Sequence, residues 1–566
     1  MLTVRRLYIL AAAFIGLLLF MHASSELLRL AVLTFTPDAE FSLSSDWWRE
    51  QLSLNLALIA VGTPLWLGHW IWAQRLARNS AEEASPLRAL FFLGVLGVTL
   101  IETAEGAGEV LFVPLARLAG NPFETANLLD HLAEVVIYGL FWTYHIRQRP
   151  PAQLQTGAAA TITRWYWYAA SFGSLGIVVT SLIPLLTTII QRFIGAESAD
   201  AAWWELPVVN SVAWIVVGSV GWSFHWAMIQ RRTATADSPE LRSALRKVYL
   251  YLSVGIAAAG ALLAIGRILY LVLLNILNAV DDQLAFRDNL AWIIPVAVVA
   301  ATGWFYHRYH LQQDAALVSE LPRQASIRRV YSYLLTAIGI SLLAFGAFGI
   351  LRLIVGILTG QADTLDLPEK FLQQQLSLYV TLLLVGLAAW VWYWRQIQHD
   401  LEADESGEER GSLVRRIYLS LVSSASVIAV VIAVGTLLYQ GLRSVLGIGS
   451  GNDFIDALNI NVSLALIAIT LLAYHVRFLR LEHRAPREEE ESTVTESQAP
   501  SAAGVAASEP ELHSLVVTLT GGDLKAAQAQ IAQSSLPEGT ELALLETSLT
   551  PDEVRRRLQA PQEDEQ

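Results

Sequence analysis

The sequence predicts an all-α integral membrane protein with about twelve transmembrane helices in six tandem hairpins, followed by a small C-terminal tail. Three observations lead to this prediction. Apolar runs such as 7–33 and 248–277 are long enough to cross a hydrocarbon core about 30 Å thick. Only 16% of the 566 residues are charged, whereas soluble chains carry about 25%. In addition, two short motifs recur six times along the chain.

The two motifs divide the chain into copies. The leading motif places a basic residue shortly before an aromatic residue at the start of an apolar run, as in Arg5–Tyr8. The closing motif ends the next apolar run, usually as an aromatic residue, two further residues and histidine, as in Trp66–His69. A short polar segment lies between the two runs. Because helices satisfy their own backbone hydrogen bonds in lipid, each copy is expected to be a helical hairpin. Copies 1 to 6 are residues 1–78, 86–149, 161–232, 243–312, 325–400 and 412–484.

The last residue of each closing motif is expected to be an interfacial anchor. Five copies end on histidine and copy 5 ends on tyrosine, in each case beside Trp, Tyr or Arg. Amphipathic rings favour the headgroup layer of a bilayer, and tyrosine is a poor substitute for an imidazole metal ligand. The sequence therefore predicts anchors without a shared metal at His69, His145, His225, His307, Tyr393 and His475.

These motifs resemble those of a bacterial multi-pass membrane family that is known only as a domain of unknown function. The resemblance covers residues 1–484 in several copies, with Phe91, Tyr393 and Leu472 departing from the pattern. It implies tandem two-helix hairpins and offers no activity, so a function has to be argued from sites.

The distribution of basic residues predicts the orientation. The segments between copies, with both outer flanks, hold 25 of the 34 Lys and Arg residues in 1–487. Basic loops stay in the cytoplasm. Both termini are therefore expected to be cytoplasmic, in a bacterial inner (cell) membrane, with the lipid bilayer as the surrounding partner.

Copies 1 and 2 carry ionisable residues where the other copies are mostly apolar. The position 14 residues after the leading aromatic is His22 in copy 1 and Glu105 in copy 2, and four residues later come Glu26 and Glu109. Charged side chains within lipid are costly and often mark ion paths or ligand sites. Three interpretations remain open: an ion or proton pathway, a divalent-metal site, and a structural polar network. The candidates are His22, Glu26, Glu102, Glu105, Glu109, His131, Glu134 and Arg267, the last as a possible partner of these carboxylates.

Motifs for catalysis are absent from the sequence. It contains no cysteine, no nucleophile elbow, no HExxH and no phosphate-binding loop. No cofactor is evident, and an enzymatic activity is not the expected one.

The C-terminal tail holds most of the negative charge. Residues 488–566 contain 16 acidic and 4 basic residues, so the acidity gives no indication of nucleic-acid binding. We expect an acidic, low-complexity linker at 485–510. Residues 511–566 are expected to form a small cytoplasmic module, α/β or partly disordered, suited to binding a cytoplasmic protein.

Three functions follow as hypotheses. The first is a structural or assembly scaffold for other membrane subunits. The second is a transporter or channel with an ion or proton pathway near copies 1 and 2. The third is a membrane metal-binding protein or enzyme.

Overall fold

The computed structural model describes residues 2–34, 45–121, 125–150, 157–194, 204–233, 238–359, 370–404, 407–448 and 451–497. The chain divides into two compact parts, Met1–Arg487 and Glu488–Gln566. Within the described residues the chain is helical and has no strand. The predicted tail module at 511–566 lies outside the described residues.

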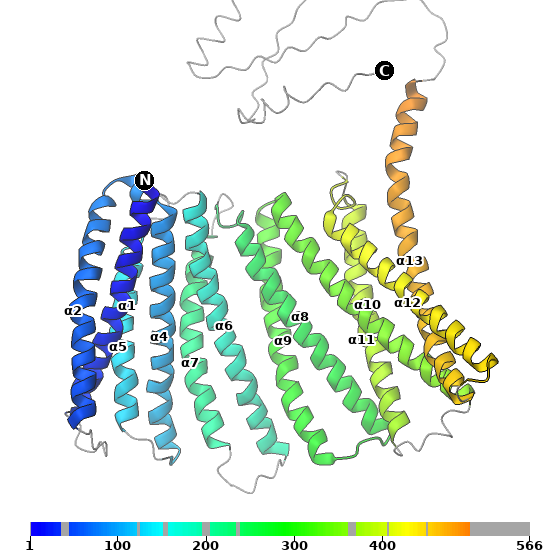
Figure 1. Ribbon diagram of the computed structural model, residues 1–566, viewed down its shortest axis with the longest axis horizontal. Helices are drawn as coiled ribbons and strands as arrows, with labels where there is room; N and C mark the ends of the chain where they lie inside the picture. The colour runs from blue at the N-terminus through cyan, green and yellow to red at the C-terminus, as the bar shows by residue number, and fades with distance from the viewer. Residues whose placement is uncertain are drawn as a thin grey trace, which may run out of the picture. The chain divides into compact units, whose positions relative to one another are not determined.

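In the described part of the chain, twelve long helices and one short helix follow each other. Figure 1 shows their order along the chain. The long helices are α1 (Leu2–Thr34), α2 (Ser45–Leu76), α4 (Pro86–Leu118), α5 (Thr125–Arg147), α6 (Gly157–Ile194), α7 (Glu205–Arg231), α8 (Ala244–Ile276), α9 (Gln283–Leu317), α10 (Pro322–Leu358), α11 (Phe371–Glu402), α12 (Leu413–Val445) and α13 (Gly451–Ser497); α3 (Ser80–Glu83) is one turn. By length and composition, eleven of the described helices are able to cross a membrane, and α5 is the long helix outside that set. The first turns of α5 carry Asp130, His131 and Glu134, which lower its mean hydropathy.

The last helix is longer than the sequence predicts. We expected a linker from residue 485, but α13 continues to Ser497. Residues 485–497 of the expected linker are therefore helical. Five of these 13 residues are glutamate, which is a good helix former.

The helices contact each other in a repeating pattern. The two helices of a copy pack along each other in α1–α2, α4–α5, α6–α7, α8–α9 and α10–α11. First helices of successive copies also touch, from α1–α4 through α10–α12. In addition, α5, α7, α9 and α11 each pack on the first helix of the preceding copy. Each copy is thus held mainly by its neighbours in sequence, as in a solenoid.

Glycines allow the closest helix contacts. A β-carbon on Gly386 of α11 would overlap the backbone at Leu343 of α10, so no larger residue fits there. On α4, a β-carbon on Gly108 would lie 2.7 Å from the ring of Trp214 on α7. Small residues at such positions allow the close van der Waals packing that holds helices together in lipid.

Candidate functional site

In most copies a hydrogen bond joins the leading aromatic to the last residue of the closing motif. The bonds join Tyr8 to His69 (3.2 Å), Tyr166 to His225 (3.0 Å), Tyr331 to Tyr393 (3.1 Å) and Tyr418 to His475 (3.3 Å). In copy 2 the leading aromatic has no hydroxyl, and the ring centroids of Phe91 and His145 lie 6.1 Å apart. The two motifs of a copy therefore meet at one end of its helix pair.

Most of these histidines are buried within the protein. The exposed fraction is 0% for His145, 1% for His225, 3% for His307 and 0% for His475, and His69 is half-buried. Each Nδ1 lies 2.7–2.9 Å from the carbonyl oxygen four residues earlier. A carbonyl only accepts, so Nδ1 donates and Nε2 is the acceptor. Nε2 meets a tyrosine hydroxyl in His69, His225 and His475, whereas in His145 and His307 it has no hydrogen-bond partner among the described residues. The rings thus act as contacts between helices.

Tryptophans link successive copies. The indole Nε1 of Trp70 donates to the hydroxyl of Tyr144 (2.9 Å), which joins copies 1 and 2. Trp226 donates to Tyr306 (2.6 Å) in the same way between copies 3 and 4. Aromatic side chains therefore form a continuous buried cluster across these copies.

Ion pairs repeat with a period of two copies, which sequence reasoning missed. An acidic residue precedes the leading aromatic by nine residues in copies 2, 4 and 6 only. Each acid binds the arginine two residues before the leading aromatic of the preceding copy. The pairs are Arg6–Glu82 (2.7 Å), Arg164–Glu240 (3.0 Å) and Arg329–Glu409 (2.8 Å). The hydrogen bond from Arg6 lowers the pKa of the Glu82 carboxyl, which lies between α2 and α4.

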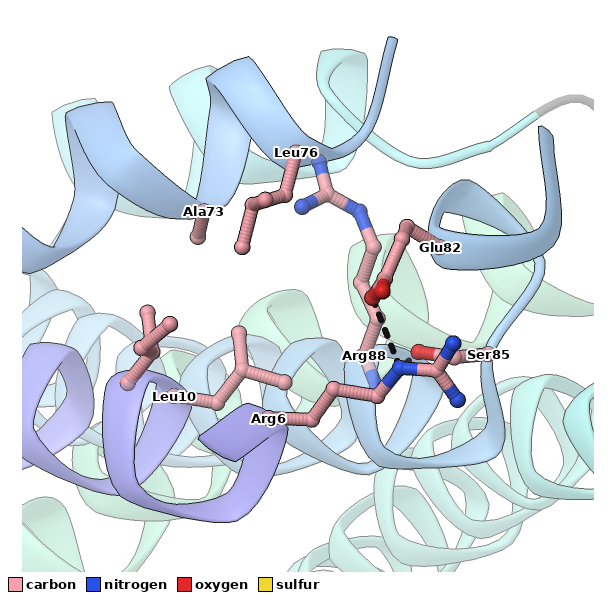
Figure 2. Close-up of a pocket in the computed structure, with 8 residues that line it drawn as sticks. Arg6, Leu10, Ala73, Leu76, Glu82, Ser85 and Arg88 are labelled. Atoms are coloured by element: carbon pink, nitrogen blue, oxygen red, sulfur yellow. Dashed lines mark hydrogen bonds and ion pairs between the residues drawn. The ribbon is translucent and has the colours of Figure 1, made fainter. Parts of the chain in front are cut away.

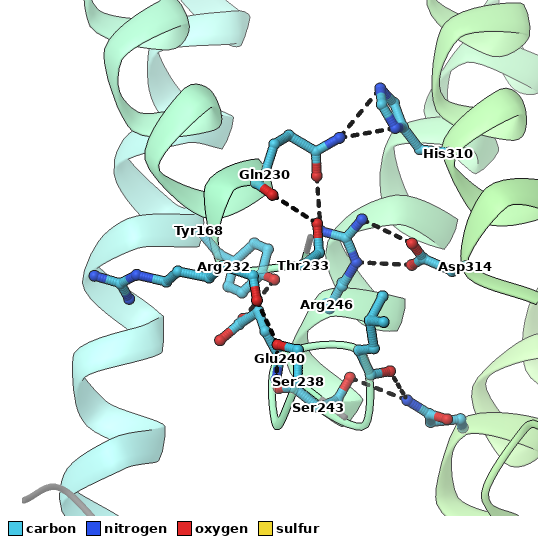
Figure 3. A network of polar contacts seen from close by, with 12 residues as sticks. Tyr168, Gln230, Arg232, Thr233, Ser238, Glu240, Ser243, Arg246, His310 and Asp314 are labelled. Atoms are coloured by element: carbon cyan, nitrogen blue, oxygen red, sulfur yellow. Dashed lines mark hydrogen bonds and ion pairs between the residues drawn. The ribbon is translucent and has the colours of Figure 1, made fainter. Parts of the chain in front are cut away.

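A buried arginine accompanies each of these ion pairs. Arg88, Arg246 and Arg415 stand three residues before the leading aromatics of copies 2, 4 and 6, and their exposed fractions are 5%, 1% and 4%. Figure 3 shows the surroundings of Arg246, which donates to both carboxylate oxygens of Asp314 at 2.7 and 2.8 Å. The irregular spacing of basic residues in the leading motifs hid this period. The position of the acids was the signal that would have revealed it.

The predicted acidic residues of copies 1 and 2 form two small groups. Arg29 binds Glu26 (2.8 Å) and Asp130 (3.5 Å), which ties α1 to α5. His131 pairs with Glu134 (3.0 Å) within α5. All five side chains are partly exposed, so they form no enclosed polar core.

The position 14 residues after the leading aromatic lies outside these two groups. It holds His22 in copy 1 and Glu105 in copy 2, and both side chains are exposed. The equivalent position is exposed in every copy, where its residues in copies 3 to 6 are Thr180, Leu263, Phe345 and Ile432. Glu105 is thus exposed in the described chain, like its counterparts in the other copies. Helices in lipid are apolar on all sides, so the sequence did not mark the inner face.

The remaining candidates stand at intermediate depth. Glu102 and Glu109 are half-buried, and Glu102 is within electrostatic range of Glu105, Glu134 and His22. Arg267 donates to Asn289 (2.7 Å) in its own copy, so its expected pairing with a carboxylate of copy 1 or 2 is not found. Among the described residues, no group of three or more His, Asp or Glu side chains is placed to hold a metal ion.

Comparison with known proteins gives one match. A family model described as "Domain of unknown function (DUF5671)" matches residues 6–144, 164–326 and 329–470. Each matched segment spans about two of the six copies, in agreement with the period of the ion pairs and buried arginines. No curated protein and no solved structure matches the chain.

Proposed function

Because the chain belongs to the DUF5671 family of domains of unknown function, we propose a function from its own structure: a multi-pass membrane scaffold that binds another membrane protein through copies 1 and 2. The three matched segments, called units 1 to 3 below, are its internal repeats.

The proposed topology has six tandem hairpins, twelve spanning helices and both termini in the cytoplasm of a bacterial cell. The positions of the basic residues support it, as does the meeting of leading and closing motifs at one end of each helix pair. Helix α5 is included because its 23 residues extend about 35 Å at about 1.5 Å per residue. It also packs along α4.

One observation carries the scaffold proposal. The position 14 residues after the leading aromatic is exposed in all six copies, and copies 4 to 6 fill it with Leu263, Phe345 and Ile432, as lipid requires. Copies 1 and 2 instead fill it with His22 and Glu105. Ionisable groups facing hydrocarbon cost about 2.5–3.5 kcal/mol each on insertion scales. A protein partner that covers them removes this cost.

The chemistry of the exposed residues defines the partner. Glu105 offers a carboxylate and His22 an imidazole, with Glu102 and Glu134 nearby. A complementary surface is a spanning helix that presents Arg, Lys or hydroxyl donors at the same depth. Arg29 is already bound to Glu26 and Asp130, so the chain itself leaves this side acidic.

Site-directed photocrosslinking tests the proposal. The chain has no cysteine, so Glu105→Cys creates a unique attachment point for a benzophenone maleimide in native membranes. Leu263→Cys, at the equivalent exposed position of copy 4, is the matched control. We expect a discrete crosslinked species from Glu105→Cys that Leu263→Cys lacks, and its mass distinguishes a second copy from a different subunit. Identical patterns for the two variants would refute the proposed interface.

A second candidate function is proton or ion passage beside copies 1 and 2. The observation in its favour is the electrostatic proximity of Glu102 to Glu105, Glu134 and His22. Purified protein in proteoliposomes that contain a pH-sensitive dye distinguishes the two functions. A proton flux that Glu102→Gln abolishes would support a pathway, whereas a scaffold produces no flux.

A further inference from the structure

A small cavity lies where the leading end of α1, the closing end of α2 and the start of α4 meet. Its volume is about 20 Å³. Figure 2 shows the side chains around it, which combine two guanidinium groups, one carboxylate and aliphatic carbon. They include Arg6, Leu10, Leu76, Glu82, Ser85 and Arg88. This cavity belongs to unit 1 and takes no part in the proposed scaffold interface.

Arg88 brings a buried charge to this cavity. Its side chain donates from Nη2 to Gln74 (2.5 Å), and its guanidinium carbon lies 5.5 Å from the ring centroid of Trp70. The Nε atom is buried and has no hydrogen-bond partner. No described carboxylate forms an ion pair with Arg88; Glu83 acts on it only at longer range.

The other charges of the cavity leave an excess of positive charge. Glu82 binds Arg5 (3.0 Å) as well as Arg6 (2.7 Å), so one carboxylate serves two arginines before Arg88 is counted. The cavity also adjoins the first turn of α4, where the Ser85 side chain caps the helix and Pro86 begins it. A helix N-terminus carries partial positive charge, which adds to that of the arginines.

Unit 2 shows how the same arrangement is neutralised. Arg246, the counterpart of Arg88, is bound at both oxygens by Asp314 and also donates to Gln230, the counterpart of Gln74 (Figure 3). Tyr168 stands at the position of Leu10, and its hydroxyl donates to Glu240 (2.7 Å). In unit 3 the same position is Tyr333, which accepts from Arg415 (3.1 Å).

Unit 1 therefore differs from unit 2 in two ways. A leucine replaces the tyrosine ring, and the buried arginine has no described carboxylate partner. Both differences leave room and charge at the same point. A space of this size accommodates one water-sized species, and the buried N–H of Arg88 calls for an acceptor.

We propose that this cavity binds a small inorganic anion of the size of chloride, which accepts the Nε hydrogen of Arg88 and takes the electrostatic place of the Asp314 carboxylate. The anion neutralises the excess positive charge where copies 1 and 2 join, and so stabilises the contact between them.

Chloride binding is measured on the purified full-length chain in an uncharged detergent. The apparent melting temperature is compared in chloride and in gluconate at equal ionic strength, and line broadening of the ³⁵Cl NMR signal reports binding directly. A ligand that binds only the folded state raises the melting temperature, and the rise grows with the logarithm of its concentration above the dissociation constant. We expect both effects in the natural chain and in Arg117→Gln, which alters an exposed arginine at the other end of α4.

Two variants remove the site in different ways. Arg88→Gln deletes the charge, and Leu10→Tyr fills the cavity with the ring found in units 2 and 3, without removing a buried partner. Both are expected to lose the chloride-dependent rise and the line broadening. Retention of both effects in Leu10→Tyr would overturn the proposal. So would a natural chain that responds to vesicles containing phosphatidylglycerol and not to chloride, because that result assigns the arginines to a lipid phosphate.

Discussion

At the scale of single residues, position within the repeat decides each side chain's surroundings. The closing histidines are bonded on both ring nitrogens in copies 1, 3 and 6, whereas His22 and Glu105 occupy a position that is exposed throughout. The sequence identified both sets of residues as unusual. It did not show which of them are buried in the protein and which are exposed. A helix in lipid has apolar residues on every face, so its hydrophobic pattern does not identify the face that packs against the protein.

The ion pair between Arg246 and Asp314 predicts a large effect of one substitution. Both side chains are almost fully buried, with exposed fractions of 1% and 5%. Asp314→Asn leaves a buried guanidinium without its counter-charge, which costs about 3–5 kcal/mol. We expect a marked fall in melting temperature in detergent. The double variant Arg246→Met/Asp314→Leu should recover much of it, and a double variant as unstable as Asp314→Asn would show that the charge is not the cause.

Glu82 predicts a pH-dependent stability. Because Arg6 lowers the pKa of this carboxyl below its ordinary value of 4.5, its contribution is fully present above that value. The contribution is lost as pH falls through the lowered pKa. At pH 7, Glu82→Gln should destabilise the chain by about 1 kcal/mol, since the pair is partly exposed. Melting curves between pH 7 and pH 3 should show the natural chain and the variant converging. A difference in melting temperature that stays constant with pH would show that the charge of Glu82 is not what stabilises the chain. Glu83→Gln is the control variant.

At the scale of helices, the sequence predicted which segments form helices. It predicted less well where a helix ends and how the copies pair with each other. Long apolar runs and the two motifs predicted each hairpin segment, because crossing lipid imposes a minimum length. The extension of α13 to Ser497 was missed, since the stretch 485–497 is rich in glutamate and has no hydrophobic periodicity in its sequence. The period of two copies was also missed, because hairpins with similar motifs were treated as equal.

The contact between α10 and α11 predicts that glycine size matters there. A β-carbon on Gly386 would overlap the backbone of α10, whereas one on Gly435 of α12 would meet nothing within 4 Å. Gly386→Leu should therefore push the helices apart and destabilise the chain by about 1–3 kcal/mol or more. Gly435→Leu should leave the melting temperature almost unchanged. Equal effects of the two substitutions would show that overlap at α10 does not limit stability.

At the scale of the whole chain, the internal repeats join residue and helix features. The family match divides residues 6–470 into three segments, and each contains one buried arginine and one acid that binds the preceding copy. Contacts mostly link neighbouring copies, so stability is expected to depend on the junctions between them. The junction within unit 1 lacks a described carboxylate for its buried arginine, in contrast to that of unit 2. The exposed ionisable positions lie on the same two copies.

The orientation of the chain gives the last prediction. Basic residues concentrate between copies, and this asymmetry predicts cytoplasmic connections there. Asp282 caps the start of α9, and Gly407 lies after the end of α11. Both positions are exposed, and the helices α9, α10 and α11 lie between them in the chain. Single cysteines are clean probes, since the chain has none. In intact cells, Asp282→Cys should react with an impermeant maleimide and Gly407→Cys should react only after permeabilisation. The reverse pattern would show that the proposed orientation is inverted. Labelling of both cysteines from outside would contradict the proposal that α9, α10 and α11 each cross the membrane.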